Sequence, residues 1–128
     1  VEQMKLADTD MVLLPGGLGG VHSILASETA MNFIRLAYEK NCLIAAICAA
    51  PTILASLHIT DGRRATCYPG LEDQMGAAKM IPCGAVQDGN VITGRAAGSA
   101  DEFGLACLRA LKGEDTARQV ASDIVYRA

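Results

Sequence analysis

The sequence has 128 residues, of which 51% are hydrophobic and 20% are charged, a composition typical of one globular domain with an apolar core. The formal net charge is −3 and no basic cluster is larger than Arg63-Arg64, which argues against nucleic acids or anionic membranes as partners. We interpret this arginine pair as a solvent-exposed turn. The longest apolar run, residues 43–55, is interrupted by Pro51 and is too short to span a bilayer.

Cysteine usage indicates the redox environment. The five cysteines form no C-x-x-C pair, and their odd number would leave one cysteine unpaired. Both features favour a reducing compartment over a disulfide framework. The N-terminus shows no basic-then-apolar signal pattern, so we expect a cytoplasmic protein. Neither of the two histidines has finger-like spacing to the cysteines, and we therefore expect no metal site. We also expect no cofactor.

Strands and helices alternate in the first half of the chain. We expect a strand at residues 10–14, then a glycine-rich loop, then a helix at residues 28–40 with Ser27 as its N-cap. A strand at residues 43–47 and a helix at residues 49–57 follow. This alternation predicts parallel strands joined by crossover helices.

The second half carries turn and capping signals. Asp88-Gly89-Asn90 lies between two β-prone runs and predicts a hairpin across residues 84–94. Ser99, with Glu102 three positions later, predicts a capping box at the start of the next helix. The remaining expected elements are a short strand at residues 64–68 and helices at residues 101–111 and 114–127.

Cys48 lies at the junction between the strand at residues 43–47 and the helix that follows it. A thiol in this position faces the unpaired N–H groups and the positive end of the helix, which favour the reactive thiolate. The junction resembles a nucleophile elbow in which Ala46 and Ala50 are the small flanking residues. The alternative is that Cys48 is a buried structural thiol.

A second apolar strand runs into the glycine-rich segment at residues 16–20. In parallel α/β folds such turns lie at the carboxyl edge of the sheet, so this segment could place free backbone N–H groups beside Cys48 as an oxyanion hole. His22 follows the segment and is a candidate at the periphery of the site. His58 lies ten residues beyond Cys48, about 15 Å along a helix, and is interpreted as a helix-end residue.

Several segments carry a family resemblance when they are taken in order. They are Leu14-Pro15-Gly16-Gly17, Ala45-Ala46-Ile47-Cys48-Ala49-Ala50-Pro51, Ala65-Thr66-Cys67-Tyr68-Pro69-Gly70, Asp88-Gly89-Asn90-Val91-Ile92-Thr93-Gly94-Arg95 and Gly98-Ser99-Ala100-Asp101-Glu102-Phe103. With them the chain resembles the ThiJ/PfpI superfamily, especially its branch of Parkinsonism-associated deglycase-like and YajL-like proteins. The resemblance implies a flavodoxin-like three-layer α/β sandwich with a mostly parallel sheet.

The resemblance also implies roles for individual residues. Cys48 would be the nucleophile, and the backbone N–H groups of Gly17 and Ala49 would bind the oxyanion that it forms. Arg95 would lie near the site or at a dimer interface. The other residues that match the edge of the family's site are Gly16, Tyr68 and Pro69.

Two positions depart from the family pattern. Protease-like members have a histidine directly after the cysteine, where this chain has Ala49, which argues against peptidase activity of that type. Deglycase-like members often have a histidine before the proline that Pro69 matches, where this chain has Tyr68. A tyrosine, with a pKa of about 10, is a poor general base at neutral pH.

The family's glutamate, which hydrogen-bonds the cysteine from the first strand-to-helix turn, has no counterpart in this chain. By resemblance, residues 1–128 form the C-terminal two-thirds of a single ThiJ/PfpI-type domain whose N-terminal strands are absent. We expect a companion segment of about sixty residues, in the same chain or in a separate one, because a flavodoxin-like sheet places its first strand in the interior. A homodimer of such units is also expected.

We expect cysteine-dependent processing of small reactive carbonyls or their glycation adducts, as in deglycases and glyoxalases, with Cys48 as nucleophile. One alternative is a redox-sensing stress-response protein or chaperone with an oxidisable Cys48. Another is a cysteine amidase or peptidase of the PfpI type. The sequence leaves these open because each would use the same thiolate.

Overall fold

Four strands form the central sheet within residues 5–126, the part of the chain that the structure, a computed structural model, describes. Their spatial order is β1-β2-β6-β5. The strands β1, β2 and β6 run parallel, and β5 is antiparallel to β6. Their bounds are β1 Met11–Leu14, β2 Leu43–Ile47, β5 Ala85–Asp88 and β6 Val91–Gly94.

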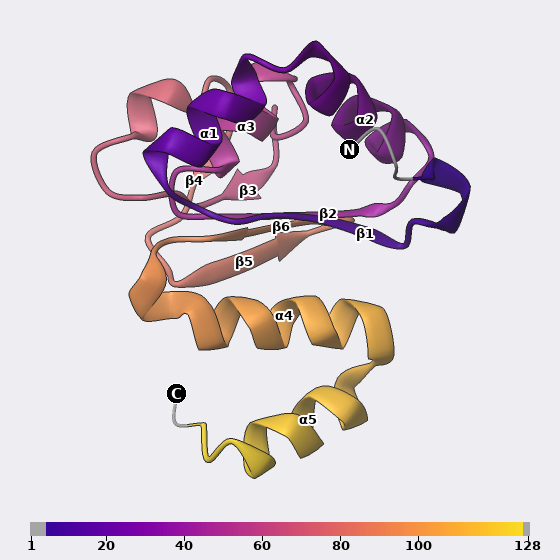
Figure 1. Cartoon of the computed structure of the whole chain (residues 1–128). Coiled ribbons are helices and arrows are strands. Elements are labelled where there is room, and N and C mark those ends of the chain that lie inside the picture. Colours follow the sequence, from indigo (N-terminus) through magenta and orange to yellow (C-terminus); the bar gives the residue numbers. More distant parts are fainter. Residues whose placement is uncertain (1–4, 127–128) are drawn as a thin grey trace.

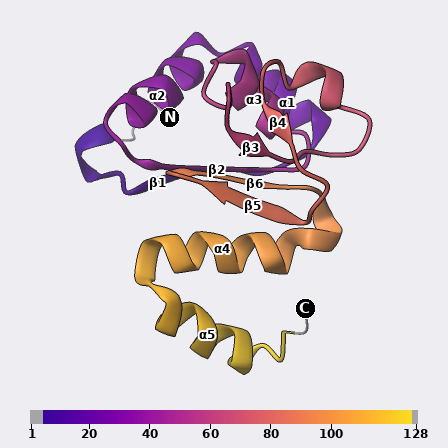
Figure 2. The same ribbon diagram turned by 180° about the vertical axis from the view of Figure 1, so that it is seen from behind.

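Helices cover both faces of this sheet. In Figure 1, α1, α2 and α3 lie above the sheet, α4 lies below it, and α5 packs on the outer side of α4; Figure 2 shows the same layers from behind. The bounds are α1 Leu18–Leu25, α2 Glu28–Glu39, α3 Pro51–Ser56, α4 Ala100–Lys112 and α5 Glu114–Asp123. The expected flavodoxin-like sandwich with a mostly parallel sheet is confirmed.

Apolar side chains fill the two interfaces between sheet and helices. On the face covered by α2 and α3, Ile44 and Ile53 are fully buried beside Ile34. On the other face, Ile92 of β6 packs against Phe103 of α4. The centre of β2 is buried on both faces, as its continuous apolar run predicts for an interior parallel strand.

The glycine-rich segment is a turn at Gly16 and Gly17 and a helix from Leu18, so the expectation of a loop is wrong for its second part. The helix α1 starts at Leu18 and contains Gly19 and Gly20, where an added Cβ would meet no atom within 4 Å. Val21 is 2% exposed and packs into the core beneath the helix. We attribute the helix to this tertiary contact, which offsets a helix cost of about 1 kcal/mol for each glycine.

Two other expected elements are shorter in the structure. The helix after β2 starts at Pro51 because residues 48–50 form a turn whose first residue has a φ of +66°. The strand expected at residues 64–68 is limited to β3, Arg64–Ala65, which pairs in parallel with β4, Lys79–Met80. It ends there because the next backbone N–H, that of Thr66, donates to the Thr93 hydroxyl.

The expected hairpin is confirmed, whereas the prediction of a capping box at Ser99 is wrong. Asp88 pairs with Val91 across the two-residue turn between β5 and β6. Ser99 makes no capping hydrogen bond, because its φ of −111° and ψ of 13° belong to a 3-10 turn and not to the extended backbone of an N-cap. The last helix, α5, ends at Asp123, and residue 127 of the expected helix lies outside the described residues.

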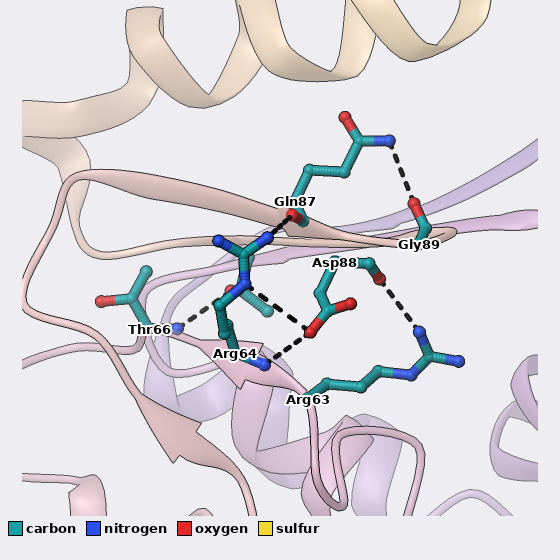
Figure 3. Close-up of polar contacts among 7 residues, drawn as sticks. Arg63, Arg64, Thr66, Gln87, Asp88 and Gly89 are labelled. Carbon is teal, nitrogen blue, oxygen red and sulfur yellow. Dashed lines mark hydrogen bonds and ion pairs between the residues drawn. The ribbon is translucent and has the colours of Figure 1, made fainter.

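Arg63 and Arg64 anchor β3 instead of forming a simple solvent-exposed turn. The Arg63 guanidinium donates to the Asp88 carbonyl oxygen at 3.0 Å and to the Tyr38 hydroxyl at 2.8 Å. The Arg64 backbone N–H donates to the Asp88 carboxylate at 2.8 Å (Figure 3). These bonds connect β3 to the β5-β6 hairpin and to α2, which corrects the interpretation made from the sequence.

Candidate functional site

Cys48 directly follows β2 at the carboxyl edge of the parallel strands. Its backbone N–H donates to the Gly94 carbonyl oxygen at 3.0 Å, and its own carbonyl oxygen accepts from the Tyr68 N–H at 2.8 Å. These bonds hold the residue at a φ of +66°, a left-handed conformation that is uncommon for residues other than glycine. The turn presents a half-buried thiol at the strand end, which is the geometry of a nucleophile elbow.

Gly16 approaches this thiol closely. A Cβ added to Gly16 would lie 2.6 Å from the Cβ of Cys48 and 3.3 Å from its Sγ, so a side chain here would force a shift. The approach follows from the strand register, because the parallel pairing of Leu14 with Ala46 brings both strand ends to one edge. The structure thus brings together the two turns that the sequence analysis singled out.

Two backbone N–H groups in the turns that carry Gly16 and Cys48 lack a hydrogen-bond partner among the described residues. Neither the Gly17 N–H nor the Ala49 N–H forms a hydrogen bond with any residue between 5 and 126. Ala49 is 3% exposed, and buried N–H groups in proteins normally have a partner. Gly17, with a φ of +98°, turns the chain from β1 into α1. An oxyanion bound at this point could accept from both groups.

Arg95 follows β6 at the same edge of the sheet. Because Ile47 pairs with Gly94, Arg95 occupies the position next to Cys48 on the neighbouring strand. Its backbone N–H donates to the Gly84 carbonyl oxygen at 2.9 Å. The structure therefore places an exposed guanidinium side chain at the edge that carries the thiol.

A cavity of about 260 Å³ lies next to this edge. Two residues expected at the site, Pro69 and Arg95, line it together with Cys67 and Glu72. Sequence reasoning did not find Glu72, whose carboxylate accepts from the Gly70 N–H at 2.8 Å. The sequence signal that could have pointed to Glu72 is local, because an acidic residue two positions after a turn glycine can accept a hydrogen bond from the N–H of that glycine.

The remaining candidates carry exposed side chains. Tyr68 is 48% exposed and reaches Cys48 through its backbone N–H. His22 is exposed on α1, and His58 forms a 3.0 Å contact with Asp61. Within the described residues neither imidazole hydrogen-bonds to the Cys48 thiol, so these histidines do not form a Cys-His pair there.

Burial distinguishes two other thiols from Cys48. Cys67 and Cys107 are 3% and 5% exposed. Burial raises the pKa of Cys107 from 9.0 to about 11. Burial, followed by the charges of Glu72 and Cys48, raises the pKa of Cys67 to about 11. Both groups therefore remain protonated thiols of low reactivity at neutral pH.

No helix within residues 5–126 combines the length and the apolar character that crossing a membrane requires. Across the same residues, histidine, cysteine, aspartate and glutamate side chains form no group of three suited to a metal ion.

Comparison with known proteins gives consistent matches. The sequence pattern of the DJ-1/PfpI family matches residues 1–110. The chain is 37% identical over 130 residues to Protein DJ-1alpha of Drosophila melanogaster, covering 98% of this chain and 58% of that protein. It is also 37% identical over 126 residues to the Parkinson disease protein 7 homolog of Danio rerio, covering 96% of this chain and 67% of that protein. The chain thus spans between 58% and 67% of the length of these curated relatives.

Solved structures share the fold. The crystal structure of Drosophila melanogaster DJ-1beta matches with a TM-score of 0.86 and 35% identity, covering 96% of this chain and 68% of that chain. An oxidized Toxoplasma gondii DJ-1 matches with a TM-score of 0.88 and 26% identity over the same shares of the two chains, 96% and 68%. Because the family pattern covers most of the sequence and the fold is the same, this chain belongs to the DJ-1/PfpI family.

Proposed function

We propose that the protein processes small reactive carbonyls or their glycation adducts with Cys48 as nucleophile, as part of a stress response. One observation carries the proposal: Cys48, at a φ of +66°, lies beside the Gly17 and Ala49 N–H groups, which have no partner among residues 5–126. A nucleophile and oxyanion donors at one point accelerate the addition of a thiol to a carbonyl.

The mechanism follows from these groups. The Cys48 sulfur adds to the aldehyde carbon, the carbon–oxygen π bond breaks, and its electron pair moves to the oxygen. The N–H groups of Gly17 and Ala49 donate to this oxyanion, each contributing about 3 kcal/mol in comparable sites. Protonation of the oxygen gives a hemithioacetal. Transfer of a proton from this carbon to the neighbouring carbonyl carbon converts the hemithioacetal into a thioester. Water then hydrolyses the carbon–sulfur bond, which releases a hydroxy acid and restores the Cys48 thiol. We assign the proton transfers to a carboxylate outside the described residues.

Consumption of methylglyoxal tests this proposal. We expect the wild-type protein to consume it, Cys48→Ser to lose the activity, and His22→Ala to keep most of it because that imidazole is exposed on α1. Cys107→Ser is the matched control, since it removes a thiol from α4 on the opposite face of the sheet. Activity that survives in Cys48→Ser would exclude the covalent mechanism.

Selective alkylation tests the assignment of the nucleophile itself. After brief treatment with iodoacetamide at neutral pH, peptide mapping should find Cys48 labelled first. Cys67 and Cys107 should react slowly because both are buried with pKa values of about 11. Preferential labelling of any other cysteine would overturn the assignment of Cys48.

A redox-sensing or chaperone role is the second candidate, and the Toxoplasma gondii DJ-1 described as oxidized favours it. In this role a peroxide would oxidise Cys48 to a sulfenate or sulfinate without turnover. Oxygen atoms on Cys48 together with no methylglyoxal consumption would support it over the enzyme. For either role we propose a cytoplasmic location, where reducing conditions would keep the five free cysteines as thiols.

A further inference from the structure

A second thiol lies beside the nucleophile. The Cys48 carbonyl oxygen accepts a hydrogen bond from the Tyr68 N–H at 2.8 Å. The Cα of Cys48 is two covalent bonds from this oxygen, and the Cα of Cys67 is two covalent bonds from the Tyr68 nitrogen. Covalent geometry therefore keeps the two Cα atoms within about 8 Å, near the range of about 4.4–6.8 Å that disulfides span. The Cys48 Sγ borders Gly16, where an added Cβ would lie 3.3 Å from the sulfur.

The two thiols differ in access and in protonation. Cys48 is half-buried at the open turn, whereas Cys67 is 3% exposed with its Sγ 3.5 Å from the Tyr68 carbonyl oxygen. Burial, Glu72 and the charge of Cys48 together raise the pKa of Cys67 to about 11. An oxidant in solution would therefore meet Cys48 first and leave Cys67 as an intact thiol beside it.

We propose that Cys67 is the resolving thiol for oxidised Cys48, so that a peroxide converts the two residues into an intramolecular disulfide. The inference rests on the proposed reactivity of Cys48. In the first step the Cys48 thiolate attacks one peroxide oxygen, the O–O bond breaks, hydroxide leaves, and Cys48 becomes a sulfenic acid. In the second step the Cys67 sulfur attacks the Cys48 sulfur, the S–O bond breaks, and hydroxide leaves with the Cys67 proton as water.

The change of charge at Cys48 favours the second step. Once the thiolate has become a neutral sulfenic acid, its share in raising the pKa of Cys67 is lost. Burial and Glu72 still oppose ionisation of Cys67. The disulfide would protect Cys48 from irreversible oxidation to the sulfonic acid, and reduction by a thiol would restore the nucleophile.

Peptide mapping after oxidation tests the inference on the soluble complex of this chain with its companion segment. The protein is treated with equimolar hydrogen peroxide, free thiols are blocked, and the digest is analysed without reductant. We expect one cross-linked peptide pair that contains Cys48 and Cys67, and an intact mass lower by two hydrogens. In Cys67→Ser, and equally in Cys67→Ala, the cross-link should be absent and Cys48 should gain one or more oxygen atoms.

Cys107→Ser is the matched control, because Cys107 is as buried as Cys67 and has the same raised pKa of about 11 but lies on α4. This variant should keep the cross-link. If wild-type Cys48 gains oxygen atoms and no cross-link forms, the inference is wrong and the reactivity of Cys48 still stands. If Cys48 is neither alkylated nor oxidised, both the inference and the proposed function are overturned.

Discussion

Backbone contacts keep Cys48 in a conformation that its residue type disfavours. A φ of +66° costs an ordinary residue about 1–2 kcal/mol. Hydrogen bonds to Gly94 and from Tyr68, together with the close approach of Gly16, fix the turn despite this cost. The small residues around Cys48 indicate an elbow in the sequence, but the sign of φ depends on these partners from other parts of the chain.

Replacement of Gly16 tests this arrangement. In Gly16→Ala the new Cβ would lie 2.6 Å from the Cβ of Cys48, so the thiol must move. We expect kcat/KM for methylglyoxal to fall by about tenfold to a hundredfold, because small displacements of a nucleophile are costly. Gly19→Ala is the matched control, since its Cβ meets no atom within 4 Å and should stabilise α1 by about 0.5–1 kcal/mol. Equal activity in the two variants would contradict the role of Gly16.

Cys107 makes the free energy of unfolding depend on pH in the alkaline range. Burial raises its pKa from 9.0 to about 11, so unfolding in this interval releases a proton. The thiol's contribution to the free energy of unfolding is thus complete below pH 9 and is lost as the pH rises through about 11. Urea denaturation should show a smaller decline across this interval for Cys107→Ala than for the wild type. The same decline in both proteins would rule out this contribution.

Among the elements, β3 and the β5-β6 hairpin depend on each other. The turn residues between β5 and β6 encode the hairpin locally, and the structure forms it there. The extent of β3 is not local, because β3 pairs with β4 and is tied to the hairpin through Asp88. This dependence on distant partners explains why a longer strand was expected from the sequence.

Asp88→Ala should loosen this connection. The variant loses the 2.8 Å hydrogen bond from the Arg64 N–H and a partly exposed ion pair of 3.8 Å with the Arg64 guanidinium. We expect the free energy of unfolding to fall by about 1–2 kcal/mol, mostly through the hydrogen bond, since exposed ion pairs contribute little. Asp123→Ala is the control, as its carboxylate accepts from Gln119 on the exposed side of α5 and should matter by less than about 0.5 kcal/mol.

Urea denaturation at low and at high salt measures the free energy of unfolding of both variants. The loss in Asp88→Ala should persist at high salt, because a hydrogen bond is screened less than an ion pair. A loss that vanishes in salt would assign the effect to the ion pair and contradict the prediction.

For the molecule as a whole, β1 presents an open edge. It is the outermost strand on its side of the sheet within the described residues. A groove of about 990 Å³ follows it, lined by Phe33 and Ile34 of α2 on one face and by Leu111 of α4 on the other. Leu13 in β1 is 47% exposed. Because the groove lies on both faces of the sheet, it fits a further strand that is buried on both sides.

We propose that a companion segment, in the same chain or in a separate one, supplies this strand beside β1, and that two such units form a homodimer. The 128-residue chain alone should then aggregate through its open edge, whereas the chain with its companion should stay soluble. Size-exclusion chromatography with intact-mass analysis distinguishes these outcomes. A stable, soluble species that contains the 128-residue chain alone would refute the proposal.

The sequence by itself determined the alternation of strands and helices, the hairpin, and the position of Cys48 at a strand end. These features depend on apolar periodicity and turn residues that act over a few neighbouring positions. Only the tertiary structure decided that the glycine segment is helical from Leu18, that Glu72 lines the cavity, and that the Tyr68 N–H, next to Cys67, donates to the Cys48 carbonyl oxygen. Each of these depends on contacts between distant residues, such as Val21 in the core, and such contacts override local preference.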